Sequence, residues 1–194
     1  MKEIARSRIG LLRPLLKDPV PGVRIAAAAA IETLEAASSI EGVLATLKTG
    51  NMGAKIGAIY ALGEIGGEKV IPPLVYCARR VEVDIRSAAV AVLGKLALPA
   101  TLGTLVEILD DECAAVAARA IAALSRFAVP ADVIKKLRTF LNASDGVLEA
   151  EAALTLAGLN DVSSSDQIAA LLASPHASTR QAAATALSRM PLLN

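Results

Sequence analysis

Residue types that carry metal or nucleophilic chemistry are scarce in this sequence. Its 194 residues include one histidine, His176, and two cysteines, Cys77 and Cys113. A zinc site takes three or four Cys, His or carboxylate ligands, and no Cys-x-x-Cys pair is present. We therefore expect no metal site, no cofactor and no catalytic residue, and we interpret His176 as a solvated turn residue. The cysteines, both in predicted helical stretches, indicate small buried side chains in a reducing compartment.

Two short motifs resemble parts of enzyme sites but favour simpler roles. Residues 62–67 read Leu-Gly-Glu-Ile-Gly-Gly, and they end a predicted helix instead of joining a strand to a helix as a phosphate loop does. Residues 163–166 read Ser-Ser-Ser-Asp, without a histidine that would activate a hydroxyl. We interpret this second run as a helix N-cap, so neither motif predicts catalysis.

Charged clusters alternate in sign along the second half of the chain. The basic residues are Arg79, Arg80, Lys135, Lys136 and Arg138, and the acidic residues between them are Glu107, Asp110 and Asp111. A nucleic-acid groove needs a continuous positive track, and the formal net charge is only +1. The pattern leaves two interpretations, a solvated face or a protein-binding face with patterned charge.

A sequence pattern that recurs six times, here called the phrase, must position these residues. It has an alanine, then leucine or isoleucine four residues later, then an apolar residue three further on. The repeated alanines are Ala27, Ala58, Ala89, Ala120, Ala152 and Ala183, at a step of 31 residues and once 32. A fixed period between about 20 and 50 residues indicates a solenoid of stacked repeats.

Each repeat is predicted to be an antiparallel pair of helices. Apolar positions within the phrase, as in residues 27–34, lie at i, i+4 and i+7 on one helix face. A second apolar segment follows in each repeat, as in residues 40–47, and breakers such as Pro99 and Pro130 separate the two. A small residue, such as Gly94, follows the repeated leucine in five repeats, so we expect a neighbouring helix to pass close there.

The composition agrees with such an all-α chain. It is 54% hydrophobic but only 2% aromatic, and the surplus is mostly alanine, the best helix former. Pro99, Gly103 and Glu107 interrupt the longest apolar segment, so none approaches the roughly 18 residues that span a membrane. The N-terminus also lacks the pattern of a secretory signal, and we expect a cytoplasmic protein.

The repeated residues resemble HEAT repeats, specifically the short bacterial HEAT-like class also found in phycobilisome lyases. Residues 17–28 resemble the opening of such a repeat, with Asp-Pro, Val-Arg and paired alanines, and residues 60–66 resemble its Ala-Leu-Gly ending. The resemblance covers essentially the whole chain. It implies an armadillo-type fold, a right-handed α-α superhelix of about six HEAT-like helix pairs. We expect residues 1–194 to form one such solenoid, with a segment of a longer chain as the alternative.

The chain also departs from the HEAT pattern. The Asp-Pro turn occurs once, at Asp18, and the cation of the helix start is replaced by Ala117 and Glu149 in two repeats. The Asp–Arg ladder that the resemblance implies between neighbouring repeats is therefore expected to be partial. Pro14 lies where other second helices are uninterrupted, which predicts a kinked or short first helix. A single histidine does not match the His-Glu pairs of iron-binding HEAT-like hydroxylases.

The resemblance further implies that the second helices line a concave, partner-binding side. Off-core positions on these helices give the candidate partner-binding residues Lys48, Tyr76, Arg79, Glu107, Asp110 and Lys135. Tyrosine and arginine are over-represented among interface hot spots. Tyr76 beside Arg79 is therefore the centre of the predicted surface. The alternative is a tyrosine ring half-packed against its neighbouring helix.

These features predict a non-catalytic protein–protein interaction scaffold in a bacterial cytoplasm. Its partner would be a protein segment on the second-helix face, with no nucleic acid and no membrane. Two alternatives stay open. One is a bilin-lyase-type chromophore-attachment enzyme or accessory, suggested by the family resemblance, and the other is a regulatory module of a larger signalling protein.

The end of the chain carries a separate prediction. The first helix of the last repeat has apolar residues at Ala182, Ala183, Ala186 and Leu187, and a short apolar tail over residues 190–193 follows it. Exposed apolar surface usually marks a contact site. We therefore expect self-association or docking of further repeats through this helix, with a tail that folds back as a cap as the alternative.

Overall fold

The computed structural model describes residues 2–191, and the side chains of residues 3–35 and 39–191. Helices alternate with short turns, and the described residues contain no strand. The contacts divide the chain into two compact units, the first up to Leu74 and the second from Val75. The all-α stack of helix pairs is confirmed, and each unit is described by itself.

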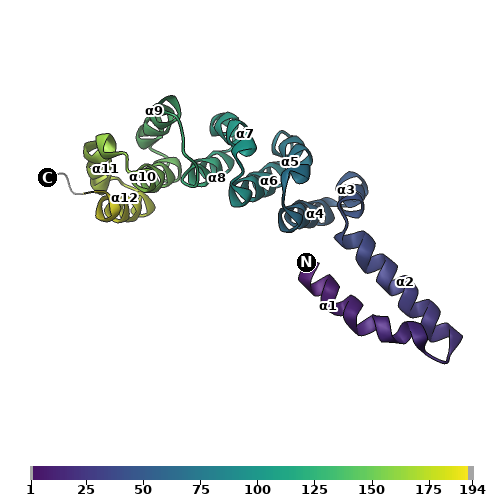
Figure 1. Ribbon diagram of the computed structural model, residues 1–194. Coiled ribbons are helices and arrows are strands. Elements are labelled where there is room, and N and C mark those ends of the chain that lie inside the picture. The colour runs from purple at the N-terminus through teal and green to yellow at the C-terminus, as the bar shows by residue number, and fades with distance from the viewer. Residues whose placement is uncertain (1, 192–194) are drawn as a thin grey trace. The chain divides into compact units, whose positions relative to one another are not determined.

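The first unit consists of antiparallel helices joined by tight turns (Figure 1). These are α1 (Lys2–Leu12), α2 (Pro21–Ser38), α3 (Ile40–Thr49), α4 (Met52–Ile65) and the start of α5 (Ile71–Ala78). Pro14 lies in a 3-10 turn that follows α1, so the expected short first helix is confirmed. Asn51 caps α4 by accepting a 2.9 Å hydrogen bond from the backbone N–H of Ala54. Gly66, at φ 69°, then ends this helix as expected.

The second unit repeats one motif, a longer first helix followed by a shorter second helix. The first helices are α6 (Val83–Leu96), α8 (Ala114–Leu124), α10 (Leu148–Gly158) and α12 (Ala177–Arg189), and the second helices are α7 (Leu102–Glu107), α9 (Ala131–Thr139) and α11 (Ser165–Ala170). In Figure 1 the first helices form one layer of this unit and the second helices form the other. A 3-10 turn ends each of these second helices, and the chain then crosses back to the first layer.

The repeated alanines lie in the core, as the periodicity predicts. All six are buried: Ala27, Ala58, Ala89, Ala120, Ala152 and Ala183. Their small side chains let successive first helices approach closely, as α6 and α8 do. An added Cβ at Gly94 would lie 2.5 Å from the Cβ of Ala123. This confirms the close helix passage expected at that glycine.

The expectation of an open apolar face on the last helix is wrong for the described residues. Ala182, Ala183 and Ala186 are 7%, 0% and 0% exposed, because this face of α12 packs against α10 and α11. Met190 is also buried, and its sulfur lies 3.8 Å from the hydroxyl of Ser165. The opposite side of α12 exposes Gln181, Ala184 and Ser188. The tail over residues 192–193 lies outside the described residues.

Three smaller expectations also change. Ser164 and Ser165 do not cap α11 through their side chains, because their hydroxyls donate to the carbonyls of Asp161 and Val162 at 2.7 Å each. Cys77 is buried as expected, but Cys113 is only half-buried and precedes α8. Within residues 2–191, no helix combines the length and the apolar composition that crossing a membrane requires.

Candidate interaction surface

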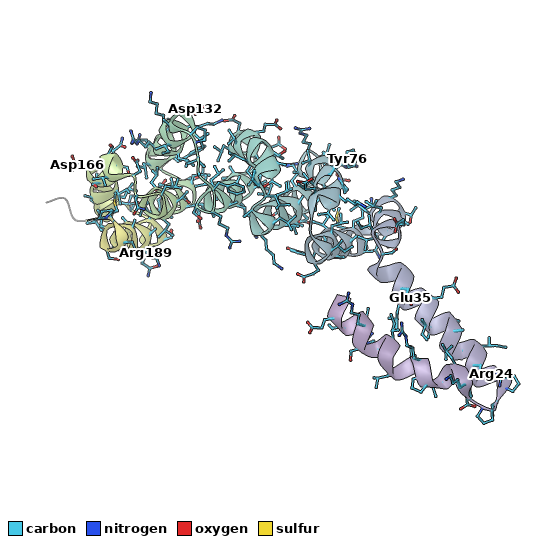
Figure 2. All side chains as sticks on the ribbon, in the orientation of Figure 1. Arg24, Glu35, Tyr76, Asp132, Asp166 and Arg189 are labelled. Carbon is cyan, nitrogen blue, oxygen red and sulfur yellow. The ribbon has the colours of Figure 1, made fainter. Side chains whose placement is uncertain are left out.

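Tyr76 projects from α5 into solvent with 62% of its surface exposed. This exposure favours the surface role over the alternative of a ring half-packed against its neighbouring helix. Arg80, one turn later, holds the ring instead: its guanidinium carbon lies 5.5 Å from the ring centroid, and its Nη1 donates a 3.0 Å hydrogen bond to the tyrosine hydroxyl. Glu82 accepts two hydrogen bonds of 3.2 Å from the same guanidinium. Tyr76 is thus exposed and held in place before any partner arrives (Figure 2).

Two exposed ion pairs extend from this tyrosine across successive repeats. The Arg79 guanidinium donates from Nη2 to Oε2 of Glu107 at 2.7 Å, and about half of each side chain is exposed. One turn after Glu107, Asp110 accepts a 2.6 Å hydrogen bond from Nζ of Lys136. The predicted surface included Arg79, Glu107 and Asp110; the structure joins Arg79 to Glu107, whereas Asp110 pairs with Lys136.

We call the six residues Tyr76, Arg79, Arg80, Glu107, Asp110 and Lys136 the charge ladder. The charge is positive in the turn that follows α5, negative on α7 and its 3-10 turn, and positive on α9. The ladder differs from the predicted surface at two positions. Arg80 was missed, although its spacing four residues after Tyr76 is the signal of a helical pair. Lys136, rather than Lys135, bridges to Asp110.

The two other predicted residues do not join these contacts. Lys135 is exposed on α9, and its side chain makes no hydrogen bond or ion pair with the rest of residues 3–35 and 39–191. Lys48 is exposed in the last turn of α3, within the first unit. The involvement of both lysines in partner binding stays a prediction.

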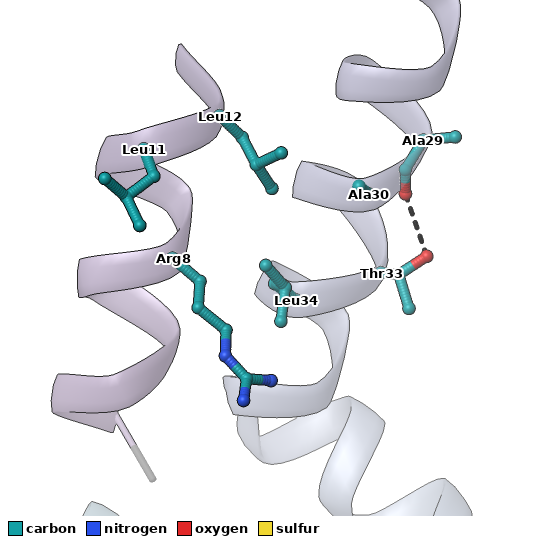
Figure 3. Close-up of a pocket in the computed structure, with 7 residues that line it drawn as sticks. All are labelled: Arg8, Leu11, Leu12, Ala29, Ala30, Thr33 and Leu34. Atoms are coloured by element: carbon teal, nitrogen blue, oxygen red, sulfur yellow. Dashed lines mark hydrogen bonds between the residues drawn. The ribbon is translucent and has the colours of Figure 1, made fainter.

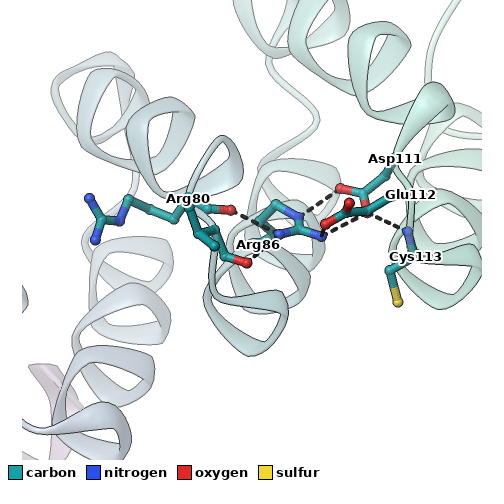
Figure 4. A network of polar contacts seen from close by, with 6 residues as sticks. Arg80, Arg86, Asp111, Glu112 and Cys113 are labelled. Atoms are coloured by element: carbon teal, nitrogen blue, oxygen red, sulfur yellow. Dashed lines mark hydrogen bonds and ion pairs between the residues drawn. The ribbon is translucent and has the colours of Figure 1, made fainter.

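A buried ion pair fixes the turns that carry the charge ladder (Figure 4). Arg86, near the start of α6, donates to both carboxylate oxygens of Asp111 at 2.8 and 3.0 Å. Its Nη1 also donates to the backbone carbonyls of Arg80 and Val81 at 3.0 and 2.6 Å. Asp111 in turn accepts the N–H of Cys113. The hydrogen bond to Asp111 raises the pKa of Arg86 further above its ordinary value, so the guanidinium stays charged while buried.

Arg138 and Asp161 form a second pair of this kind. The guanidinium of Arg138 donates from Nε and Nη2 to the two carboxylate oxygens. Asp161 is buried, and this hydrogen bond raises the pKa of Arg138. The pair ties α9, which carries Lys136, to the turn before α11. Two-contact ion pairs therefore hold the turns next to the charge ladder.

Metal-binding residue types are not clustered in the described part of the chain. No group of three or more His, Cys, Asp or Glu side chains suited to a metal ion occurs among residues 2–191. His176 is half-buried instead of solvated, because its ring lies against Gly146: an added Cβ at that glycine would be 2.8 Å from its Cγ. Ser178 also donates a 2.9 Å hydrogen bond to the Gly146 carbonyl. The histidine thus contributes to packing between repeats.

A basic hollow of about 350 Å³ lies on the first-helix layer, between α6 and α8. Its lining includes Lys95, Arg119 and Arg126 around a floor of Gly94 and alanines. Arg126 approaches the Gly94 carbonyl at 3.5 Å, a favourable place for a cation near a helix C-terminus. We interpret this hollow as the space that is left where the first helices α6 and α8 pack against each other.

The comparisons with known proteins bear on the whole chain. A family model described as HEAT repeats matches residues 9–94 and 80–157. The chain matches no curated protein sequence. Among solved structures, a designed armadillo repeat protein in complex with the peptide (KR)4 is 17% identical, with a TM-score of 0.57 over 94% of this chain and 99% of that chain.

Two further solved structures agree in architecture. Computationally designed armadillo repeat proteins for modular peptide recognition give 16% identity and a TM-score of 0.54, over 94% of this chain and 100% of that chain. An engineered protein from a structural genomics consortium gives 20% identity and a TM-score of 0.53, over 94% and 96% of the two chains. At these identities the likeness concerns the fold.

Proposed function

Because the chain belongs to the HEAT-repeat family, we propose that it is a non-catalytic interaction scaffold that binds a protein segment along the charge ladder. The observation that carries this proposal is the state of Tyr76. A large aromatic side chain, 62% exposed, contacts Arg80 through its ring face and its hydroxyl. Tyrosine and arginine are over-represented among interface hot spots, and a contact that restricts the ring lowers the conformational entropy that binding costs.

The exposed ion pairs of the charge ladder can be replaced by ion pairs with a partner. A solvent-exposed salt bridge contributes about 0–1 kcal/mol, so the Arg79–Glu107 pair can open at small cost. The ladder presents positive, negative and then positive charge along three successive second helices. A segment with negative, positive and then negative side chains at matching intervals would complement it, and this pattern favours correct partners over wrong ones.

The solved neighbours support this proposal at the level of architecture. One of them is a designed armadillo repeat protein in complex with a peptide, so a stack of this kind can hold a peptide. The phycobilisome-lyase type, a bacterial source and a cytoplasmic location are finer assignments that stay predictions. So does the involvement of Lys48 and Lys135.

The experiment is a pull-down from lysate with the full chain, followed by mass spectrometry and by titration of each recovered partner. We expect Tyr76→Ala with Arg79→Ala to weaken binding by about tenfold or more, since truncation of a hot-spot residue costs about 2 kcal/mol or more. Far-UV circular dichroism should not change. The matched control is Arg119→Ala with Gln181→Ala, two exposed positions on the first-helix layer. Equal affinity of the two double variants would place the binding site elsewhere.

A further inference from the structure

An apolar groove of about 580 Å³ runs between α1 and α2 in the first unit. Its lining residues are Arg8, Leu11 and Leu12 from α1, and Ala29, Ala30, Thr33 and Leu34 from α2 (Figure 3). In Figure 3 the side chains of Arg8 and Leu12 extend toward α2, with Leu34 opposite them. None of these lining residues belongs to the charge ladder, so the groove raises a separate question of function.

Small side chains leave the groove open on the α2 side. Ala29 and Ala30 line it there, together with Thr33 and Leu34. An alanine side chain is a single methyl group, so the face of α2 toward α1 is not filled. Small side chains on that face also allow another helix to approach closely.

Apolar side chains of α1 continue the groove toward solvent. Ile4 is 58% exposed and Leu11 is 75% exposed. The two residues are seven positions apart and share a helix face with Arg8 between them. Leu15, in the 3-10 turn after α1, is 40% exposed and extends the same stripe. Exposed apolar residues grouped on one face in this way mark an interaction site more often than isolated surface leucines do.

The groove also has a charge. Arg8 is exposed and forms no hydrogen bond or ion pair with any residue in the described part of the chain. Arg6 is also exposed, but it lies two residues from Arg8, about 200° around α1, and does not line the groove. Arg8 is thus the one charged residue of the lining, and the side formed by α2 is mostly apolar.

We infer that this groove binds an acidic amphipathic helix of a partner protein. The apolar stripe of that helix would cover Leu11, Ala30 and Leu34, and a carboxylate beside the stripe would pair with Arg8. A helix laid into a groove anchors through side chains at i, i+3, i+4 and i+7, which a space of this size between two helices accommodates. A lipid surface would instead favour a flat or convex apolar face with cations around it, and here the apolar surface is concave.

The test uses two labelled synthetic helical peptides with the same leucine stripe. One carries glutamate beside the stripe and the other carries lysine, and fluorescence anisotropy measures their binding to the full chain. We expect the glutamate peptide to bind at least tenfold more tightly. Arg8→Glu should reduce that preference at least tenfold. The matched control Arg6→Glu, the same charge change two residues away, should reduce it much less.

Two further measurements distinguish a helix bound in the groove from a peptide bound at the charge ladder and from a bound membrane. Ala30→Leu fills the groove and should weaken binding of the glutamate peptide at least fivefold, whereas the Tyr76 and Arg79 variants should leave its binding unchanged.

Three outcomes would overturn the inference: equal binding of both peptides, no binding of either, or equal effects of Arg8→Glu and Arg6→Glu. Co-flotation with phosphatidylcholine–phosphatidylserine vesicles, reduced equally by both charge reversals, would indicate a membrane instead. If Ala30→Leu lowers helicity, the two charge reversals still decide the outcome.

Discussion

Arg86 and Asp111 form a two-contact ion pair in which both side chains are almost fully buried, 7% and 5% exposed. This pair is the form of Asp–Arg ladder that the family resemblance implies, and it occurs between two neighbouring repeats. Arg24 and Arg180, at equivalent helix starts, donate only to backbone carbonyls five and six residues earlier. Glu149, which replaces the cation, accepts a 3.2 Å hydrogen bond from Thr179. The expectation that the Asp–Arg ladder between repeats is only partial is thus confirmed.

The first prediction concerns this pair. Arg86→Ala leaves the carboxylate of Asp111 buried without its cation, and breaking a buried pair in this way costs about 3–5 kcal/mol. Arg79→Ala, which breaks the exposed pair with Glu107, should cost about 1 kcal/mol or less. Urea unfolding followed by circular dichroism measures both. Similar unfolding midpoints for the two variants would mean that the buried pair contributes no more than the exposed one.

The second prediction concerns the repeated alanine. Ala89 is 0% exposed between packed helices, so Ala89→Leu forces extra methyl groups into a filled core and should cost about 1–3 kcal/mol. Ala184→Leu, on the exposed side of α12, is the matched control and should leave the melting temperature nearly unchanged. An unchanged melting temperature for Ala89→Leu would show that the alanine column is not closely packed.

The third prediction concerns the approach of α6 to α8. Gly94→Ala would place a methyl group 2.5 Å from the Cβ of Ala123, so the helices must separate, at about 1–3 kcal/mol. In the background of Ala123→Gly the same substitution should be much less destabilising, because the opposing Cβ is gone. A double-mutant cycle on unfolding free energies measures the coupling. Additive effects would contradict a direct contact.

The fourth prediction concerns pH. Partial burial of Glu151 raises its pKa above the ordinary value of 4.5, so the folded chain holds this proton more tightly than the unfolded chain does. The associated stability is present below the unfolded pKa and is lost as pH rises through the folded pKa. Glu151→Gln should therefore be more stable than the wild type at pH 7, with a smaller difference at pH 4. A difference independent of pH would contradict a raised pKa at this carboxyl group.

Much of the fold follows from local pattern. Alanine at a 31-residue step, with apolar residues four and seven positions later, predicts which helix faces are buried. The structure confirms that the alanine itself is buried, at Ala89 and in the other five repeats. Pro14 and Gly66 act on the backbone itself, so their effects on helix ends are also predictable. Helical spacing also places Tyr76, Arg79 and Glu107 off the core, whereas their choice as a partner-binding surface came from the resemblance to HEAT repeats.

Contacts between repeats were decided only by the tertiary structure. Spacing shows that Lys135 and Lys136 lie on the same helix, but the rotation of α9 against α7 selects Lys136 for Asp110. The same spacing leaves the last helix with an apolar face, and only its packing against α10 and α11 shows that Ala183 and Ala186 are covered. The physical reason is that periodicity determines positions around one helix axis, whereas ion pairs, burial and open grooves depend on the distance and rotation between axes.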